Sequence, residues 1–283
     1  MAKKKEKLTA ALIDEYMTYL REQERSRATV QKYSRDLSAL SNYLDGRTLD
    51  KAVLIEWKRQ LTENYAPATV NSMIAALNGF LSFIDRQELA VKPLKIQKSL
   101  FLDEHRELTR SEYARLVKTA QSRENERLSL IIQTICSTGI RVSELEFITV
   151  EAAERGRAEV SNKGKRRTVF LSDRLCSLLK DYCHKQKKTA GAVFTTRSGR
   201  AIDRSNIWRD MKVLCDGAGV EQEKVFPHNL RHLFARTYYT QEKDLSRLAD
   251  ILGHSDISTT RIYTAESGTV HAKQMERVGL IIT

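Results

Sequence analysis

The chain has 283 residues, 41% of them hydrophobic, and a formal net charge of +12. This length indicates about two domains, and the positive excess indicates a polyanionic partner, nucleic acid before membrane. We expect neither a membrane nor a secreted protein, because no apolar run is long enough to span a bilayer and Asp14, Glu15 and Arg21 interrupt the residues after the basic start.

Both halves of the chain carry the positive excess. Residues 1–100 hold 17 Lys and Arg against 12 Asp and Glu, so they contribute +5, and the remaining residues contribute +7. We therefore expect an acidic ligand to contact both halves.

Residues 8–87 predict a module of about four helices. The second helix carries an apolar stripe from Val30 to Leu44 at three- and four-residue spacing, as the buried face of an amphipathic helix does. A third helix is expected over roughly 49–61. Pro67 fits the first turn of a fourth helix, where its missing N–H costs nothing.

The helical pattern fails between residues 88 and 104, where a proline and three lysines interrupt it. We expect a basic linker there, with Lys95 and Lys98 as candidate contacts to a DNA backbone, although a solvated loop explains the same residues equally well. The linker would separate a DNA-binding domain of residues 1–87 from a second domain of residues 105–283.

The second domain is expected to be mostly helical with one small antiparallel sheet. Thr109 and Glu112 form the pattern of a capping box, which predicts a helix start. Residues 158–160 and 168–171 alternate as two short strands do, and the intervening 161–166 predict a basic hairpin tip. Further helices are expected at about 173–187, 204–217, 228–241 and 244–252.

The cysteines predict neither a disulfide nor a metal site. The four residues Cys136, Cys176, Cys183 and Cys215 form no CxxC pair and no zinc set. We expect buried thiols in a reducing compartment.

Six polar side chains fall into four segments that stand out from the rest of the chain. His228 and Arg231 are three residues apart and so share one helix face. Tyr263 follows His254 by nine positions, at the end of a predicted short helix. Each residue alone is more often a surface or packing residue, and their joint occurrence carries the argument. The six are Arg141, Lys163, His228, Arg231, His254 and Tyr263.

Together these side chains suffice for phosphoryl transfer through a covalent intermediate. A phosphodiester under attack gathers negative charge on its non-bridging oxygens, and each guanidinium can donate two parallel hydrogen bonds to them. A tyrosine hydroxyl can attack if its proton is taken up, histidine can transfer protons, and lysine can protonate a departing alkoxide. The set needs no acidic metal cluster, so we expect neither a metal nor another cofactor.

At these residues the chain resembles the tyrosine recombinases, in their Xer-like, simple-site branch. Residues 139–145 resemble the first arginine box of the family, residues 227–235 its His-x-x-Arg box, and residues 252–264 its histidine and nucleophile box. Residues 8–87 resemble its helical core-binding domain. The resemblance implies a mainly α fold, with a SAM-like N-terminal domain and a mostly α catalytic domain that carries a small antiparallel sheet.

The resemblance also implies how the phosphate is held. Arg141 and Arg231 would clamp the scissile phosphate, and His254 would donate a hydrogen bond to it. Glu144 and His232 would hold the site without acting on the substrate.

The resemblance further implies the covalent chemistry. Tyr263 would form a 3′-phosphotyrosyl bond, with His228 as the base, and Lys163 would protonate the leaving 5′-oxygen. The hairpin is one residue shorter than is usual in the family, which leaves Lys165 as a rival acid. Lys165, Arg166 and Arg167 are candidate DNA contacts.

The implied partner is double-stranded DNA with an inverted-repeat core site. Strand exchange would pass through a Holliday junction without ATP, in a homotetramer joined by exchange of C-terminal tails that end in Leu280-Ile281-Ile282. Accessory proteins are possible partners, a membrane is not, and we expect a cytoplasmic, nucleoid-associated enzyme. The short segment before residue 8 implies a simple-site enzyme without an arm-binding domain.

Two other functions compete with recombination. A type IB topoisomerase uses similar chemistry to relax DNA, and a DNA-binding regulator can keep the fold while losing catalysis. A missing member of the six residues would indicate the regulator, and all six are present. The tail lacks the histidine-rich ending associated with Xer proteins, and the sequence leaves the target site and the integrase, resolvase or invertase role open.

Overall fold

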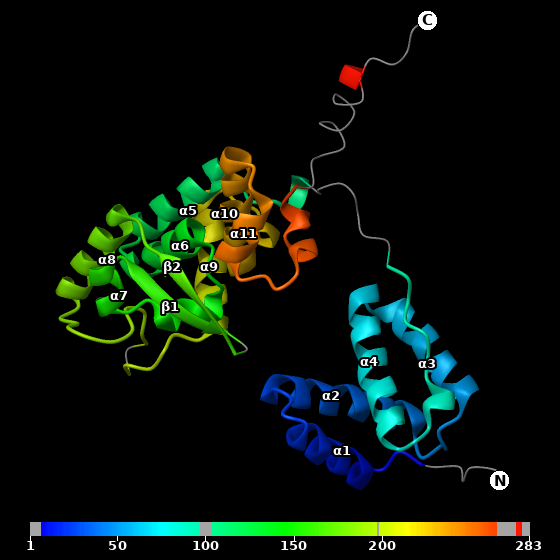
Figure 1. The fold of residues 1–283 in the computed structure, drawn as a ribbon. Coiled ribbons are helices and arrows are strands. Elements are labelled where there is room, and N and C mark those ends of the chain that lie inside the picture. Colours follow the sequence, from blue (N-terminus) through cyan, green and yellow to red (C-terminus); the bar gives the residue numbers. More distant parts are fainter. Residues whose placement is uncertain (1–6, 97–103, 163, 197, 265–275, 279–283) are drawn as a thin grey trace, which may run out of the picture. The chain divides into compact units, whose positions relative to one another are not determined.

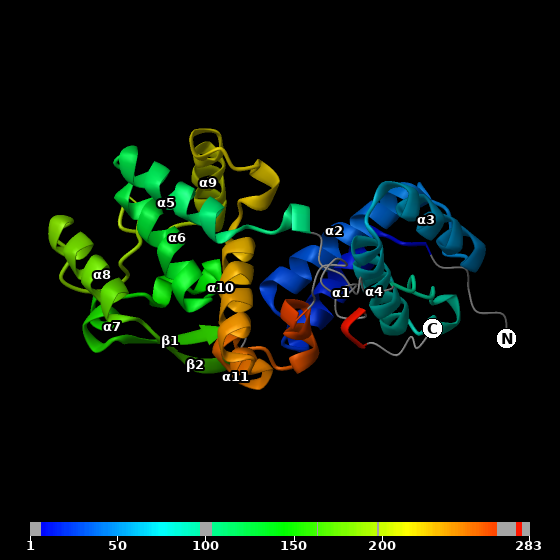
Figure 2. The same cartoon turned by 90° about the horizontal axis from the view of Figure 1, so that it is seen from above.

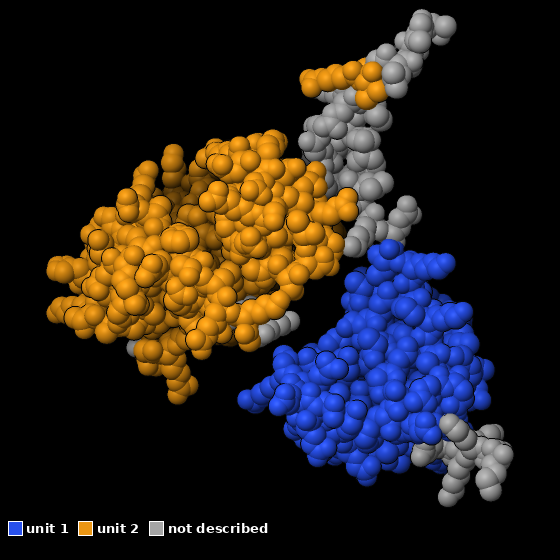
Figure 3. All heavy atoms as spheres, in the orientation of Figure 1, with its two compact units in different colours: residues 1–98 blue, residues 99–283 orange. Residues whose placement is uncertain are grey.

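The computed structural model of the chain contains two compact units, residues 1–98 and residues 99–283 (Figure 3). Each unit has its own cluster of buried apolar side chains, so each supplies a hydrophobic core of its own. The structure describes residues 7–96, 104–162, 164–196, 198–264 and 276–278.

Four helices make up the described part of unit 1. Helix α2 packs on α1 and α4, and α3 packs on α4, which buries the stripe that begins at Val30. Ser26 caps α2 by accepting a hydrogen bond from the N–H of Thr29, and Pro67 occupies the first turn of α4 as expected. The helices are α1 (Ala10–Glu22), α2 (Arg27–Leu44), α3 (Lys51–Asn64) and α4 (Pro67–Phe83) (Figure 1).

The segment after α4 packs on unit 1 in place of the linker expected from residue 88. The side-chain amide of Asn78 pairs with both the N–H and the carbonyl of Val91, at 2.9 Å each. Asn71 pairs in the same way with Leu94, at 2.7 and 2.9 Å. The two asparagines lie two helical turns apart and so share one face of α4. Residues 88–94 therefore pack on α4 where a free linker was expected, because these asparagines take up backbone groups that a free linker would leave to water. The bounds of the linker stay a prediction.

Seven α-helices and one hairpin form the described part of unit 2. Helix α6 lies at the centre, where it packs against α5, α8, α9 and α10. The capping box predicted at Thr109 and Glu112 is confirmed at the start of α5. The helices are α5 (Arg110–Ser122), α6 (Glu126–Thr138), α7 (Val150–Arg155), α8 (Asp173–Lys185), α9 (Arg204–Ala218), α10 (Pro227–Glu242) and α11 (Leu245–Leu252).

The hairpin is longer than its alternation predicted. Strands β1 (Arg157–Asn162) and β2 (Lys165–Phe170) pair antiparallel, and the pairing continues to Asn162 opposite Lys165. The expected tip of residues 161–166 was therefore too wide, because polar residues on the outer face extend the ladder without breaking it. Figure 2 shows the hairpin running toward the end of α11.

Three absences can be stated for the described part of the chain. The four cysteines are free thiols, three of them buried and Cys136 half-buried. No described helix is long and apolar enough to cross a membrane. Within the same residues, no group of three or more His, Cys, Asp or Glu side chains is placed to hold a metal ion.

Candidate active site

The first arginine enters the site from a glycine turn at the end of α6. Gly139 caps the helix with φ +66°, and a Cβ there would lie 2.4 Å from the ring of Phe234. Only glycine fits both restrictions. The chain then turns into the 3-10 helix η3 (Val142–Phe147), whose first residues place Arg141 beside Glu144.

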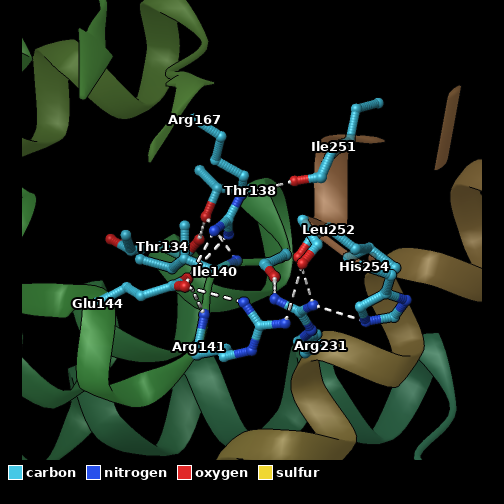
Figure 4. Close-up of polar contacts among 12 residues, drawn as sticks. Thr134, Thr138, Ile140, Arg141, Glu144, Arg167, Arg231, Ile251, Leu252 and His254 are labelled. Carbon is cyan, nitrogen blue, oxygen red and sulfur yellow. Dashed lines mark hydrogen bonds and ion pairs between the residues drawn. The ribbon is translucent and has the colours of Figure 1, made fainter. Parts of the chain in front are cut away.

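A buried carboxylate lies between two guanidinium groups (Figure 4). Glu144 is 1% exposed and accepts hydrogen bonds from the backbone N–H of Arg141 at 2.8 Å and from its Nη1 at 2.9 Å. Arg167 of β2 adds two more, from Nη1 at 2.9 Å and Nη2 at 2.8 Å. Burial alone would raise the pKa of Glu144, but the bonds from Arg167 and Arg141 outweigh it and lower the pKa to about 2.

The second arginine is buried within α10. Pro227 begins this helix, so His228 and Arg231 lie in its first two turns and face the site together. Arg231 is 2% exposed and donates to the carbonyl of Gly139 at 2.6 Å and to that of Leu252 at 2.7 Å.

The C-terminal end of α11 gathers three arginines. The carbonyl of Ile251 accepts from Nε of Arg167 at 3.0 Å, that of Leu252 from Nη2 of Arg231, and that of Gly253 from Nη2 of Arg141 at 3.4 Å. The last carbonyls of a helix lack intrahelical partners and carry partial negative charge. They therefore offset the repulsion among guanidinium groups held close together.

His254 follows directly and joins the arginines to the nucleophile segment. Its Nε2 lies 3.0 Å from Nη2 of Arg231, and its Nδ1 lies 2.9 Å from Oγ1 of the fully buried Thr260. Because Arg231 can only donate, Nε2 accepts and the ring proton sits on Nδ1. Burial lowers the pKa of His254 to about 4, and the charges of Arg231 and Arg141 act in the same direction.

Tyr263 lies inside the site and is 5% exposed. Its ring stacks on His254 at 6.3 Å between centroids and meets His232 edge-on at 5.1 Å. Burial raises the pKa of Tyr263, against the opposing effect of Arg231. The short helix expected before it consists of two 3-10 turns, η5 (Ile257–Thr259) and η6 (Arg261–Thr264).

A cavity of about 560 Å³ opens beside these groups. It is lined by Arg141 and His254 and, from the hairpin, by Lys165, Arg166 and Arg167. Lys165 and Arg166 are exposed, as expected of DNA contacts, whereas Arg167 was expected beside them and is instead turned inward. Arg167 turns inward because it forms an ion pair with Glu144. The sequence of the hairpin does not predict this pair, because Glu144 lies outside the hairpin.

Two predicted residues fall outside the described residues, namely Lys163 and Lys98. Lys95 is exposed on unit 1. His228 is also open to solvent on one side, although partial burial and the nearby charges of His232 and Arg231 lower its pKa.

The comparisons with known proteins identify the family. Residues 106–269 match the phage integrase family, and residues 13–88 match the N-terminal SAM-like domain of phage integrases. The chain belongs to the phage integrase family of tyrosine recombinases. The fold expected from the sequence is thereby confirmed, with its SAM-like helical domain and its catalytic domain with a small sheet.

Individual relatives agree with this assignment. Tyrosine recombinase XerD of Lacticaseibacillus casei is 31% identical over 89% of this chain and 93% of its own length. XerD of Vibrio cholerae is 28% identical over 83% of this chain and 85% of its own length. A crystal structure of a lambda integrase tetramer bound to a Holliday junction has a TM-score of 0.74 at 17% identity, over 92% of this chain and 78% of that one.

Sequence reasoning missed a second group behind the recombinase site. Glu107 lies between Arg236, at 3.2 Å, and Nδ1 of His232, at 3.7 Å, and so connects the start of unit 2 to α10. A second cavity of about 390 Å³, lined by Arg141, His228 and the half-exposed Trp208 of α9 among others, was also missed. The spacing of Glu107 and Trp208 gives no signal, because only the tertiary fold brings them to α10.

Proposed function

We propose that the chain is a site-specific DNA recombinase that cuts and rejoins DNA through a 3′-phosphotyrosyl intermediate. The observation that carries this proposal is the meeting of four side chains at the end of α11. Arg141, Arg231, His254 and Tyr263 come from three separate segments, and the carbonyls of residues 252 and 253 bring both arginines together.

Arg141 and Arg231 bind the scissile phosphate in this proposal. Arg231 is anchored and buried, whereas the side chain of Arg141 is 32% exposed and borders the cavity. Two fixed guanidinium groups in a partly dry site stabilise the charge that builds up on the phosphate oxygens. They supply positive charge by themselves, so no metal ion is needed for this purpose, and because the covalent link would conserve the phosphodiester energy, no ATP is implied.

The covalent step balances with the residues present. The Tyr263 hydroxyl attacks phosphorus, its proton passes to His228, and the bond to the 5′-oxygen breaks. Lys163 protonates that oxygen, with Lys165, which lines the cavity, as the alternative donor. His254 donates to the phosphate once it turns from its present partners. The phosphotyrosyl bond conserves the energy of the broken phosphodiester.

Rejoining requires a second duplex. A freed 5′-hydroxyl of the partner duplex attacks the phosphotyrosine, and exchange of both strands passes through a Holliday junction. A related structure shows a lambda integrase tetramer on such a junction, which supports the same arrangement here. We propose an inverted-repeat core site, a homotetramer joined by its C-terminal tails, accessory proteins where the site requires them, and a nucleoid location. Residues 265–275 and 279–283 of the tail lie outside the described residues.

The experiment uses duplexes that the protein enriches from a random-sequence pool. Copies nicked at successive positions let a short 5′-hydroxyl fragment escape, so that the covalent intermediate accumulates. The wild type should give a protein–DNA adduct on a denaturing gel. Tyr263→Phe should bind the duplex and give no adduct. Tyr238 packs against the same hydrophobic cluster as Tyr263, and Tyr238→Phe should give the wild-type yield of adduct. An undiminished adduct from Tyr263→Phe refutes the assignment.

A further inference from the structure

Arg167 is the most buried basic side chain among the described residues of the hairpin. Its side chain is 14% exposed, against 32% for Arg141, and its hydrogen bonds run inward. Two reach Glu144 and one reaches the carbonyl of Ile251. Its aliphatic part lies against Gly253, where a Cβ would meet its Cδ at 2.9 Å. The neighbouring backbone thus leaves room for this side chain and for little else.

Arg141 and Arg167 together donate four hydrogen bonds to Glu144. An ionised carboxylate offers about four acceptor positions on its two oxygens. Arg141 occupies two of them, one through its backbone N–H and one through Nη1. Arg167 occupies the other two with a parallel pair of donors. Arg141 therefore gives a single side-chain N–H to Glu144 and one to the carbonyl of Gly253, and its remaining N–H groups are left for the cavity that it borders.

The charges at this position lead to the same result. Arg141, Arg167 and Glu144 together carry one net positive charge, which faces the cavity through Arg141. Without Arg167 the net charge of these three residues would be zero, and the buried carboxylate would lose two of the hydrogen bonds that it accepts. Arg141 is the cation already bonded to Glu144, and a carboxylate out of reach of water is costly to leave unsatisfied.

We propose that Arg167 is a positioning residue that occupies Glu144 and so keeps Arg141 available to the scissile phosphate. This inference rests on the proposed function for the identity of the phosphate. Arg167 acts only through Glu144 and does not contact DNA, in contrast to the exposed Lys165 and Arg166 of the same strand.

The proposal predicts the behaviour of two neutral substitutions. Arg167→Met keeps the aliphatic packing and removes the charge, so single-turnover cleavage should fall by about 100-fold, as when one phosphate-stabilising donor is lost. The dissociation constant for the selected duplex should change by less than about threefold, because the lost group is no DNA contact. Arg167→Met combined with Glu144→Gln restores the single net positive charge and should recover at least about tenfold of the rate.

A second comparison avoids Arg167→Met alone, in which the buried carboxylate of Glu144 has lost two hydrogen bonds and which is therefore the variant at risk of not folding. In the Glu144→Gln background Arg167 has no carboxylate to occupy, so adding Arg167→Met should change the cleavage rate by less than about threefold. A loss of about 100-fold in that background would mean that Arg167 acts on the DNA itself, and the proposal would be wrong.

The matched control is Arg115→Met. Arg115 also caps a helix end. It donates to the carbonyl of Ala218, the last residue of α9, at 2.8 Å and to that of Gly219 at 3.0 Å, and it takes no part in the site. Its loss should lower the melting temperature and leave the cleavage rate per folded molecule unchanged. If Glu144→Gln fails to rescue Arg167→Met, a purely structural role is established instead.

A crystal structure of Arg167→Met tests the inference independently of cleavage. Arg141 should then place two side-chain donors on Glu144. If it keeps the single contact, the inference is overturned even where cleavage is impaired. If instead the wild type gives no adduct while Arg141 collapses onto Glu144 in the variant, the positioning role stands and the proposed function fails.

Discussion

Single ionisable residues set the protonation of the site before any substrate binds. Glu144 is ionised in the interior because two arginines hold it, and His254 is neutral because burial, and after it the charge of Arg231, lowers its pKa to about 4. Tyr263 keeps its proton, since burial raises its pKa. The free enzyme therefore presents fixed positive charge and a protonated nucleophile, and an entering phosphate meets both.

The protonation of His254 predicts an acid-sensitive stability. Its pKa is about 4 in the folded protein against an ordinary value of 6.5, so below pH 6.5 the unfolded chain takes up a proton that the folded chain refuses. The free energy of unfolding should fall between pH 6.5 and pH 4 by about 1–3 kcal/mol. The lower end of this range allows for solvent screening, because His254 is only partly buried.

Urea unfolding at a series of pH values measures this fall. His254→Asn removes one of two histidines whose pKa is lowered to about 4, so the fall over that window should become smaller, and His228 accounts for the part that remains. Glu144 does not change the stability between pH 6.5 and about pH 4.5. Its contribution to the free energy of unfolding is lost only as the pH drops below about 4.5 toward 2. An unchanged slope in His254→Asn would show that other groups cause it.

At the scale of elements, the sequence predicted those features that depend on neighbouring residues alone, such as the starts of helices. The capping box at Thr109 and the proline at the start of α4 are satisfied within a few residues, and both were predicted correctly. The docking of residues 88–94 was not, because Asn71 and Asn78 act on backbone that is 13 or 23 positions away. A sequence pattern does not carry such contacts.

In the candidate site too, features that depend on one segment could be predicted, and those that depend on a distant contact could not. The motif residues Arg141, Arg231, His254 and Tyr263 could be predicted from their segments, since the family resemblance covers each segment whole. The inward turn of Arg167 could not, because its partner Glu144 lies 23 positions earlier and the basic tip offers an equally plausible outward role. The position of Lys163 remains a prediction.

The glycine turn after α6 predicts that adding one methyl group at Gly139 lowers the stability of the fold markedly. In Gly139→Ala the left-handed backbone costs about 1–2 kcal/mol, and the clash with Phe234 adds about 1–3 kcal/mol. Gly219→Ala, with φ +58° and nothing within 4 Å of its Cβ, should show the backbone cost alone. Chemical denaturation of both variants gives the difference, and equal losses would mean that Phe234 moves aside freely.

At the scale of the whole molecule, charge is spread over both units. The excess of +5 in residues 1–100 and +7 in the remainder indicates that both take part in holding DNA. Each unit also has its own core, so each can be studied by itself. The family assignment explains why a basic helical unit precedes the catalytic one.

The charge distribution predicts a steep dependence of DNA affinity on salt. Each neutralised phosphate releases counterions, so the logarithm of the binding constant should fall linearly with the logarithm of salt concentration. A fragment of residues 1–98 should bind more weakly and with a shallower slope than the full chain. Fluorescence anisotropy at several salt concentrations measures both, and a fragment with the full slope would show that the catalytic unit contributes no phosphate contacts.

The three consecutive carbonyls at the end of α11 tie three arginines of the candidate site to one helix end. Arg141, Arg167 and Arg231 are held by neighbouring peptide groups of a single helix end, so none of them can be released by a shift of α11 without the other two. We expect a shift of α11 to remove one anchor from each arginine at once, while Arg141 keeps Glu144 and Arg231 keeps the carbonyl of Gly139. The proposed grip on a phosphate would then loosen at both of these arginines together.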